Sequence, residues 1–76
     1  MTLSTPHPVP GIYRHYKGAL YEVLGTSLHS ETEEHLVVYR ALYGEYGLWV
    51  RPLEMFVEAV TVGDTMQARF ALEKAF

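Results

Sequence analysis

The sequence contains no cysteine, no long apolar run and no large excess of one charge. Without cysteine, the chain can form no disulfide and offers no thiolate as a nucleophile or zinc ligand. No stretch approaches the roughly 20 apolar residues that span a membrane, and residues 1–10 lack the basic and apolar regions of a signal peptide. We therefore expect a cytoplasmic protein that has no membrane contact.

The size and charge of the chain disfavour some classes of function. The chain has 76 residues and a formal net charge of −3, so we expect one domain with a small core. Such a core leaves little room for a deep active-site cavity, and a negative protein suits non-specific nucleic-acid binding poorly. No glycine-rich phosphate loop is present, and we expect no cofactor.

Aromatic residues are abundant, at 13% of the chain, and their large rings suit a small core.

Short runs of residues with high β-propensity, separated by turn signals, predict about five short antiparallel strands. Their ranges are 12–16, 20–28, 36–41, 48–51 and 57–62. A glycine inside a strand often marks a bulge, so Gly25 is expected to bend the second strand. The polar segment 29–35 is predicted to be a hairpin loop. Pro52 ends the fourth strand and is expected at the first position of a helical or 3₁₀ turn over residues 52–56.

This pattern predicts an all-β fold, a small SH3-like barrel or roll. Residues 1–10 are interpreted as a flexible arm, residues 11–62 as the barrel domain and residues 63–76 as a C-terminal tail. Within the tail, residues 71–75 favour a helix, whereas residues 68–70 could extend a strand. The structure of residues 65–76 therefore stays open between a strand and a short helix.

The strand 36–41 is apolar on both faces, since Leu36 and Val38 point one way and Val37 and Tyr39 the other. The segment 48–50 behaves in the same way. Only one face of a barrel strand lies inside, so the second face needs a cover. The candidates are the arm, the tail and another molecule. Whether Trp49 lies in the core or on the surface depends on the strand register.

Several ordered blocks of the chain, between Tyr13 and Phe56, resemble a known family. They are Tyr13-Arg14-His15-Tyr16-Lys17-Gly18, Leu20-Tyr21-Glu22-Val23, His29-Ser30-Glu31-Thr32, Leu36 to Gly44, and Gly47-Leu48-Trp49-Val50-Arg51-Pro52 with Met55-Phe56. The family is a small, mainly bacterial one known as domain of unknown function 1653. The resemblance implies an SH3-like barrel, and it implies no activity or catalytic residue.

Aromatic and basic residues occur close together along the chain and form the first candidate site. Arginine and aromatic rings together suit stacking, cation–π contacts and the pairing of phosphate or carboxylate groups. Alternatively, the rings fill the core and the arginines lie at its edges. The candidate binding residues are Tyr13, Arg14, His15, Tyr39, Arg40, Tyr43, Trp49 and Arg51.

The polar loop forms the second candidate, with His29, Ser30 and Glu31 as its leading residues. Two histidines and several carboxylates in residues 29–35 are metal-ligand types, but their spacing matches no standard site. The alternative is that the serine and threonine hydroxyl groups stabilise the turn. We therefore predict no metal site.

Three functions follow from these residues. The leading hypothesis is a non-catalytic interaction module that binds a protein segment or a second copy of the chain through the aromatic and basic face. The first alternative is a single-stranded nucleic-acid-binding domain, in which the rings stack on bases and the arginines contact phosphates. The second is a small hydrolase or ligand-binding domain centred on His15 and His29, in which either histidine pairs with Glu22 or Glu31 in acid–base chemistry.

Overall fold

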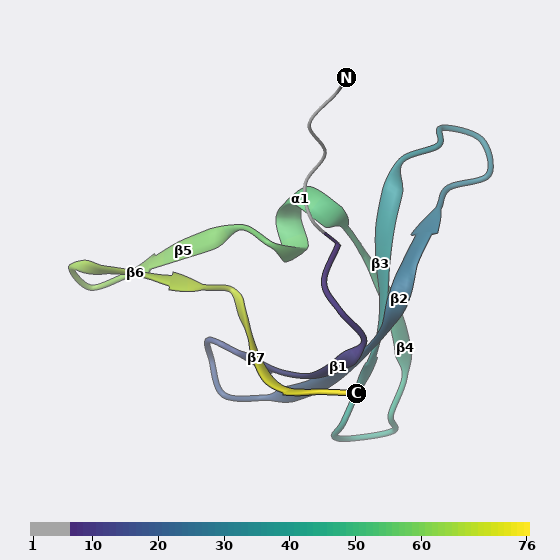
Figure 1. Cartoon of the computed structure of the whole chain (residues 1–76). Coiled ribbons are helices and arrows are strands. Elements are labelled where there is room, and N and C mark those ends of the chain that lie inside the picture. The colour runs from purple at the N-terminus through teal and green to yellow at the C-terminus, as the bar shows by residue number, and fades with distance from the viewer. Residues whose placement is uncertain (1–6) are drawn as a thin grey trace.

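The computed structural model describes residues 7–76, so the first six residues of the predicted arm lie outside the described part of the chain. The described residues form seven strands and one short helix (Figure 1). These are β1 (Gly11–His15), β2 (Leu20–Leu28), β3 (His35–Ala41), β4 (Leu48–Pro52), α1 (Leu53–Phe56), β5 (Ala59–Val62), β6 (Thr65–Ala68) and β7 (Phe70–Ala75). The prediction of a mainly β fold is therefore confirmed. No helix within residues 7–76 is long and apolar enough to cross a membrane.

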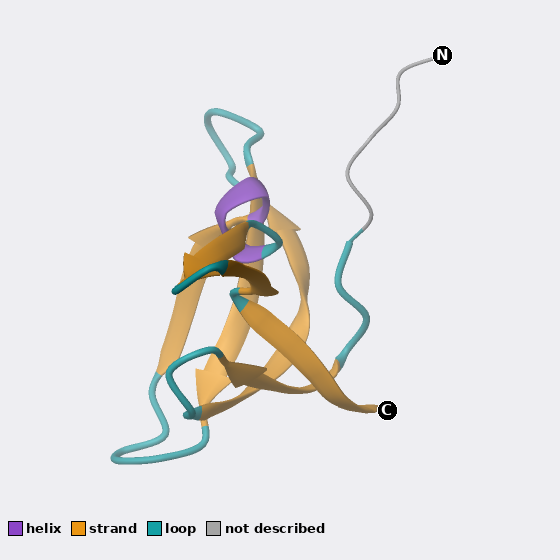
Figure 2. Ribbon diagram, turned by 90° about the vertical axis from the view of Figure 1, so that its left-hand side faces the viewer, coloured by secondary structure: helices purple, strands orange, loops and turns teal. Residues whose placement is uncertain are grey.

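The strands divide into a five-stranded sheet and a separate hairpin. The sheet has the order β4-β3-β2-β1-β7, and among the described strands β5 pairs only with β6. All pairs are antiparallel. Figure 2 shows how the sheet curves, and Figure 1 shows the β5–β6 hairpin projecting away from β3 and β4. No pairing in residues 7–76 joins β4 to β7. The predicted barrel or roll is therefore confirmed as far as its antiparallel strands, but the described strands do not form a closed barrel.

The longest pair of strands contains the predicted bulge. The register between β2 and β3 shifts between Val23 and Gly25, so one extra residue of β2 lies opposite β3. Such an extra residue increases the local twist and bends the strand. The bend helps the sheet to curve around the core side chains.

The C-terminal segment differs from its local preference, because residues 71–75 favour a helix but form strand β7. Strand β7 pairs with β1, and its first residue, Phe70, is buried. This pairing and burial outweigh the weak helix propensity of the segment. The two backbones approach closely at Gly11, where an added Cβ would collide with the carbonyl oxygen of Lys74. Only glycine fits this position.

The core lies inside the curve of the sheet and is rich in aromatic rings. Helix α1 contributes Leu53 and Phe56 to it. The Phe56 and Phe70 rings stack in parallel, with centroids 4.1 Å apart. Pro52 is the N-cap of this helix rather than its first residue, which corrects the prediction by one position. The packed core consists of Tyr13, Val23, Val37, Tyr39, Leu53, Phe56 and Phe70.

Candidate functional site

The register of β3 and β4 decides where Trp49 lies. Trp49 is directly opposite Tyr39, and Arg51 is opposite Val37. Opposed residues share a face of the sheet, and Tyr39 and Val37 are buried in the core. Trp49 and Arg51 therefore lie on the core face. Trp49 nevertheless remains 58% exposed, since β4 is the edge strand of the sheet.

Beside this edge the core face opens into a pocket of about 210 Å³, which we call the Trp49 pocket. The hydroxyl groups of Tyr21 and Tyr43 are hydrogen-bonded at 2.7 Å. The Nε of Arg51 donates to the Tyr39 hydroxyl at 3.4 Å. These bonds link the polar ends of four of the lining side chains. The lining residues are Tyr21, Tyr39, Tyr43, Trp49 and Arg51.

Arg51 is the only charged residue among those that line the Trp49 pocket. The ion pairs within residues 7–76 are Arg14 with Glu73 and Arg69 with Glu58, so Arg51 has no carboxylate partner there. The Arg51 guanidinium carbon lies 5.6 Å from the centroid of the Phe70 ring, a cation–π contact. Burial lowers the pKa of His15, and the nearby positive charges of Arg51, Arg69 and Lys17 lower it further. A guanidinium that has no carboxylate partner in the described residues can pair with an anionic group.

Tyr21 is a neutral hydrogen-bonding group in this pocket. Burial and the hydrogen bond with Tyr43 raise its pKa to about 12. The phenol therefore keeps its proton at neutral pH and offers polar contacts without charge. Tyr21 is not among the predicted site residues. The sequence around it indicates a strand, but it does not indicate which residues the side chain would meet. The signal that could have found it is the hairpin register, which places Tyr21 opposite Ala41 on the same face as Tyr39.

Of the eight predicted binding residues, Tyr39, Tyr43, Trp49 and Arg51 meet in the Trp49 pocket. His15 lies close by, with its ring centroid 6.3 Å from that of Tyr21. The structure thus brings together residues from the end of β1, from β3 and β4, and from the turn between β3 and β4.

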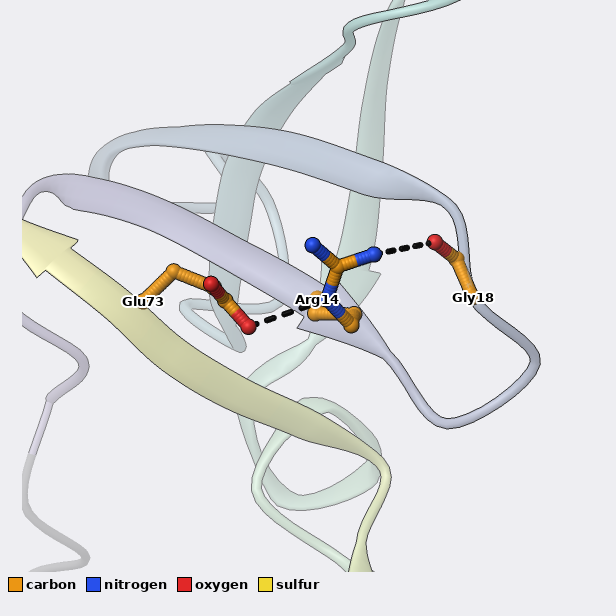
Figure 3. A network of polar contacts seen from close by, with 3 residues as sticks. All are labelled: Arg14, Gly18 and Glu73. Carbon is orange, nitrogen blue, oxygen red and sulfur yellow. Dashed lines mark hydrogen bonds and ion pairs between the residues drawn. The ribbon is translucent and has the colours of Figure 1, made fainter.

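Three predicted binding residues lie elsewhere and have structural contacts. Tyr13 is buried in the core, and its hydroxyl donates to the Val9 carbonyl oxygen at 2.7 Å. Arg14 joins β1, β7 and the following turn, because it pairs with Glu73 at 2.9 Å and donates to the Gly18 carbonyl oxygen at 2.9 Å (Figure 3). Arg40 lies on the outer face and donates to a backbone carbonyl in the β3–β4 turn.

The polar loop closes on itself. The Nδ1 atom of His29 accepts hydrogen bonds from the backbone N–H groups of Glu31 and Thr32. The Thr32 hydroxyl oxygen accepts the N–H of Glu34, which fits the turn-forming role weighed for this hydroxyl. Ser30 and Glu31 are exposed. In the described part of the chain, no group of three or more histidine, aspartate or glutamate residues is placed to hold a metal ion.

The two histidines of the catalytic alternative do not share a site. His15 precedes the turn into β2, and His29 follows the end of this nine-residue strand. At about 3.3 Å per residue, the strand separates them by roughly 25–30 Å. A joint acid–base pair would need both groups within hydrogen-bond reach of one substrate. The geometry gives no support to a single site that contains both.

A second pocket, of about 150 Å³, lies near the other end of β3 and is lined by Glu34, His35, Pro52, Leu53 and Glu54. It contains none of the predicted site residues. Its two carboxylates give it a polar, acidic rim. The aromatic and basic residues are thus concentrated at the Trp49 pocket.

Comparison with known proteins gives two similarities. Residues 11–72 match the model of a family described as "Protein of unknown function (DUF1653)". The crystal structure of a protein from Bordetella bronchiseptica, described as belonging to DUF1653, is 42% identical to the chain. The match covers 88% of each chain with a TM-score of 0.80. No curated protein matches the sequence.

Proposed function

Because the chain belongs to the DUF1653 family, whose description gives no activity, we propose from the geometry of the Trp49 pocket that it is a non-catalytic interaction module for an extended, acidic protein segment. The observation that carries this proposal is Arg51, which pairs with no carboxylate in residues 7–76, beside the exposed Trp49 on a sheet edge that no other described strand covers. Tryptophan, tyrosine and arginine are the side chains that contribute most to binding energy at protein interfaces.

The backbone of β4 supports recognition by strand addition. The N–H of Ala41 donates to the carbonyl oxygen of Gly47 at 3.0 Å, which sets the hydrogen-bonding alternation along the β3–β4 ladder. The backbone groups of Trp49 and Arg51 then point toward β3, whereas those of Leu48 and Val50 point outward. An extended segment can pair with these outward groups as an additional strand.

The side chains beside this edge favour an acidic segment. In a strand added along β4, alternate residues point to the core face, where the Trp49 pocket lies. A carboxylate there can pair with the Arg51 guanidinium, and its neighbours can pack on the Trp49 ring. A hydrogen bond between charged groups contributes about 1.5–3 kcal/mol. We therefore expect acidic segments to bind more tightly than neutral or basic ones of the same length.

The test is an NMR titration of the ¹⁵N-labelled protein with capped ten-residue peptides that alternate valine with glutamate, glutamine or lysine. We expect the glutamate peptide to shift the resonances of Leu48, Val50 and the Trp49 indole, and to bind at least about tenfold more tightly than the glutamine peptide, since 1.4 kcal/mol is a factor of ten. Arg51→Gln should remove this preference, and the matched variant Arg14→Gln should keep it. Equal affinity for the three peptides would contradict the acidic preference, and no shifts on β4 would contradict the module.

An oligothymidylate of ten nucleotides tests the nucleic-acid alternative on the same residues. Binding that weakens steeply as salt increases, with shifts of Trp49 and Tyr43, would assign the pocket to single-stranded nucleic acid. We expect no such binding, because the chain carries a net charge of −3 and Arg14 is paired with Glu73.

A further inference from the structure

Strand β4 is an open edge whose side chains are exposed on both faces of the sheet. Leu48, Trp49 and Val50 are 56%, 58% and 56% exposed, and within residues 7–76 the strand pairs only with β3. We propose that β4 pairs antiparallel with β4 of a second copy of the chain, in a register centred on Trp49, whenever no partner segment is bound. This inference rests on the proposed function in one respect, that both use the same edge.

The two edge strands of the sheet, β7 and β4, differ in their charged residues. Strand β7 carries Glu73 and Lys74, and Glu73 is held in an ion pair with Arg14. Charges on an edge strand oppose pairing with other chains. Strand β4 has Leu48, Trp49 and Val50 in sequence, and Arg51 is its only charged residue. An exposed apolar edge of this kind is a template for another strand, so association is expected at β4 rather than at β7.

Hydrogen bonding limits the possible registers. The outward backbone groups of β4 belong to Leu48 and Val50, as the alternation set by the Ala41–Gly47 bond requires. A two-fold axis at Trp49 places Leu48 opposite Val50 of the second copy. Each such pair can exchange two backbone hydrogen bonds. An axis at Val50 would instead place Leu48 opposite Pro52, which has no N–H to donate to the Leu48 carbonyl oxygen.

The same register also places compatible side chains opposite one another. The two Trp49 rings meet on the core face beside the two-fold axis, where aromatic pairs are favourable. On the outer face, Leu48 meets Val50 of the second copy, next to Val38, which lies opposite Val50 within each chain. Arg51 faces Gly47 of the second copy, so no side chain opposes it. The two Arg51 residues are four strand positions apart, about 13 Å. This separation exceeds the screening length of about 8–10 Å at physiological salt, so the repulsion between the two charges is largely screened.

Dimer formation and segment binding therefore exclude one another, because both use the outward groups of Leu48 and Val50. In the free protein, the second copy forms hydrogen bonds with the outward backbone groups of Leu48 and Val50. An acidic segment displaces it by adding the ion pair with Arg51, a contact that the second copy does not supply. The apparent affinity for a segment should consequently fall as the protein concentration rises.

The first test measures association by sedimentation velocity over a range of concentrations for the protein, Val50→Lys and the control Leu72→Lys. Val50 and Leu72 are similarly exposed, at 56% and 50%, and lie on opposite edge strands. We expect a reversible dimer that Val50→Lys weakens at least tenfold and that Leu72→Lys leaves within twofold. A monomer at concentrations up to about 1 mM, the range of very weak specific association, would overturn the inference, as would equal effects of both variants.

A second test needs no variant. In a mixture of differently labelled chains, the register predicts intermolecular nuclear Overhauser effects between the amide regions of Leu48 and Val50 and between the two Trp49 rings. Intermolecular contacts confined to other strands would overturn the inference. The two proposals fail separately: a monomer whose β4 resonances still shift with the glutamate peptide contradicts only the dimer, whereas a β4 dimer that the peptide leaves unchanged contradicts only the proposed function.

Discussion

Arg51 connects the core, the pocket and the edge strand. Its Nε bonds to the Tyr39 hydroxyl, and its guanidinium lies over the Phe70 ring. It is also the second cause, after burial, of the lowered pKa of His15. The arginine is thus held by aromatic groups, and no carboxylate in residues 7–76 neutralises it.

This arrangement predicts that Arg51→Gln raises the pKa of His15, because the imidazolium form no longer faces that positive charge. The pKa should stay below its usual value, since burial is the larger cause. An NMR pH titration of the imidazole protons measures the change, with Arg14→Gln as the control that leaves it unaltered. A His15 pKa that is unchanged or lower in Arg51→Gln would contradict the prediction.

The same shift gives the pH dependence of stability. A histidine whose pKa is lower in the folded chain binds its proton more readily in the unfolded chain. The contribution of His15 to stability is therefore fully present above the usual histidine pKa. This contribution decreases as the pH falls from the usual histidine pKa through the lowered pKa of His15 in the folded chain. Acidification through this range should therefore lower the free energy of unfolding.

At the scale of elements, the β2–β3 loop is held together by hydrogen bonds to one side chain, that of His29. Two backbone N–H groups converge on the Nδ1 atom of His29. The backbone adds two further bonds, since the N–H of Glu33 donates to the His29 carbonyl oxygen and the N–H of His29 donates to that of Glu34. The imidazole of His29 thus has a structural role in this loop.

His29→Ala should therefore loosen the loop by removing both acceptor contacts, at a cost of about 0.5–1.5 kcal/mol for a typical net hydrogen bond. The amide hydrogens of Glu31 and Thr32 are expected to exchange faster with solvent. His29→Asn is the matched control, because the amide oxygen can accept the same N–H groups. Equal exchange rates in the alanine variant and the unchanged protein would show that the imidazole contributes nothing to the loop.

At the scale of the whole molecule, the C-terminal strand completes both the sheet and the core. Strand β7 pairs along β1, and Phe70 stacks on Phe56 and contacts the Tyr39 ring. In addition, the N–H of Tyr16 donates to the Arg69 carbonyl oxygen. The first and last strands of the described chain thus stabilise each other across the sheet.

Removal of residues 69–76 should consequently unfold the protein. Loss of one buried phenylalanine side chain costs about 3–5 kcal/mol, and small domains have only about 5–15 kcal/mol of stability in total. The β1–β7 ladder is lost as well. NMR chemical-shift dispersion measures the result, and deletion of Phe76 alone, which is 70% exposed, is the control that should remain folded. A dispersed spectrum from the shorter chain would refute this role of β7.

The sequence by itself determined most of the strands, the loop and the bulge at Gly25, because these depend on local patterns. Alternating apolar residues, β-branched side chains, glycine and proline act on their own neighbourhood in the chain. The family resemblance was also accessible, since the blocks between Tyr13 and Phe56 are contiguous. Four of the eight predicted binding residues meet in one pocket for the same reason, as all four belong to the β3–β4 hairpin.

Only the tertiary structure decided the remaining features, which all depend on pairing between distant segments. Residues 71–75 form a strand because β1 supplies a partner about 60 positions earlier in the sequence. Tyr21 lines the pocket because β2 lies beside β3, and Tyr13 is buried because the sheet curves over it. The open edge at β4 likewise exists because no other described strand pairs with it. Local propensity contributes less than about 1 kcal/mol per residue, so hydrogen-bonded partners and burial determine these positions.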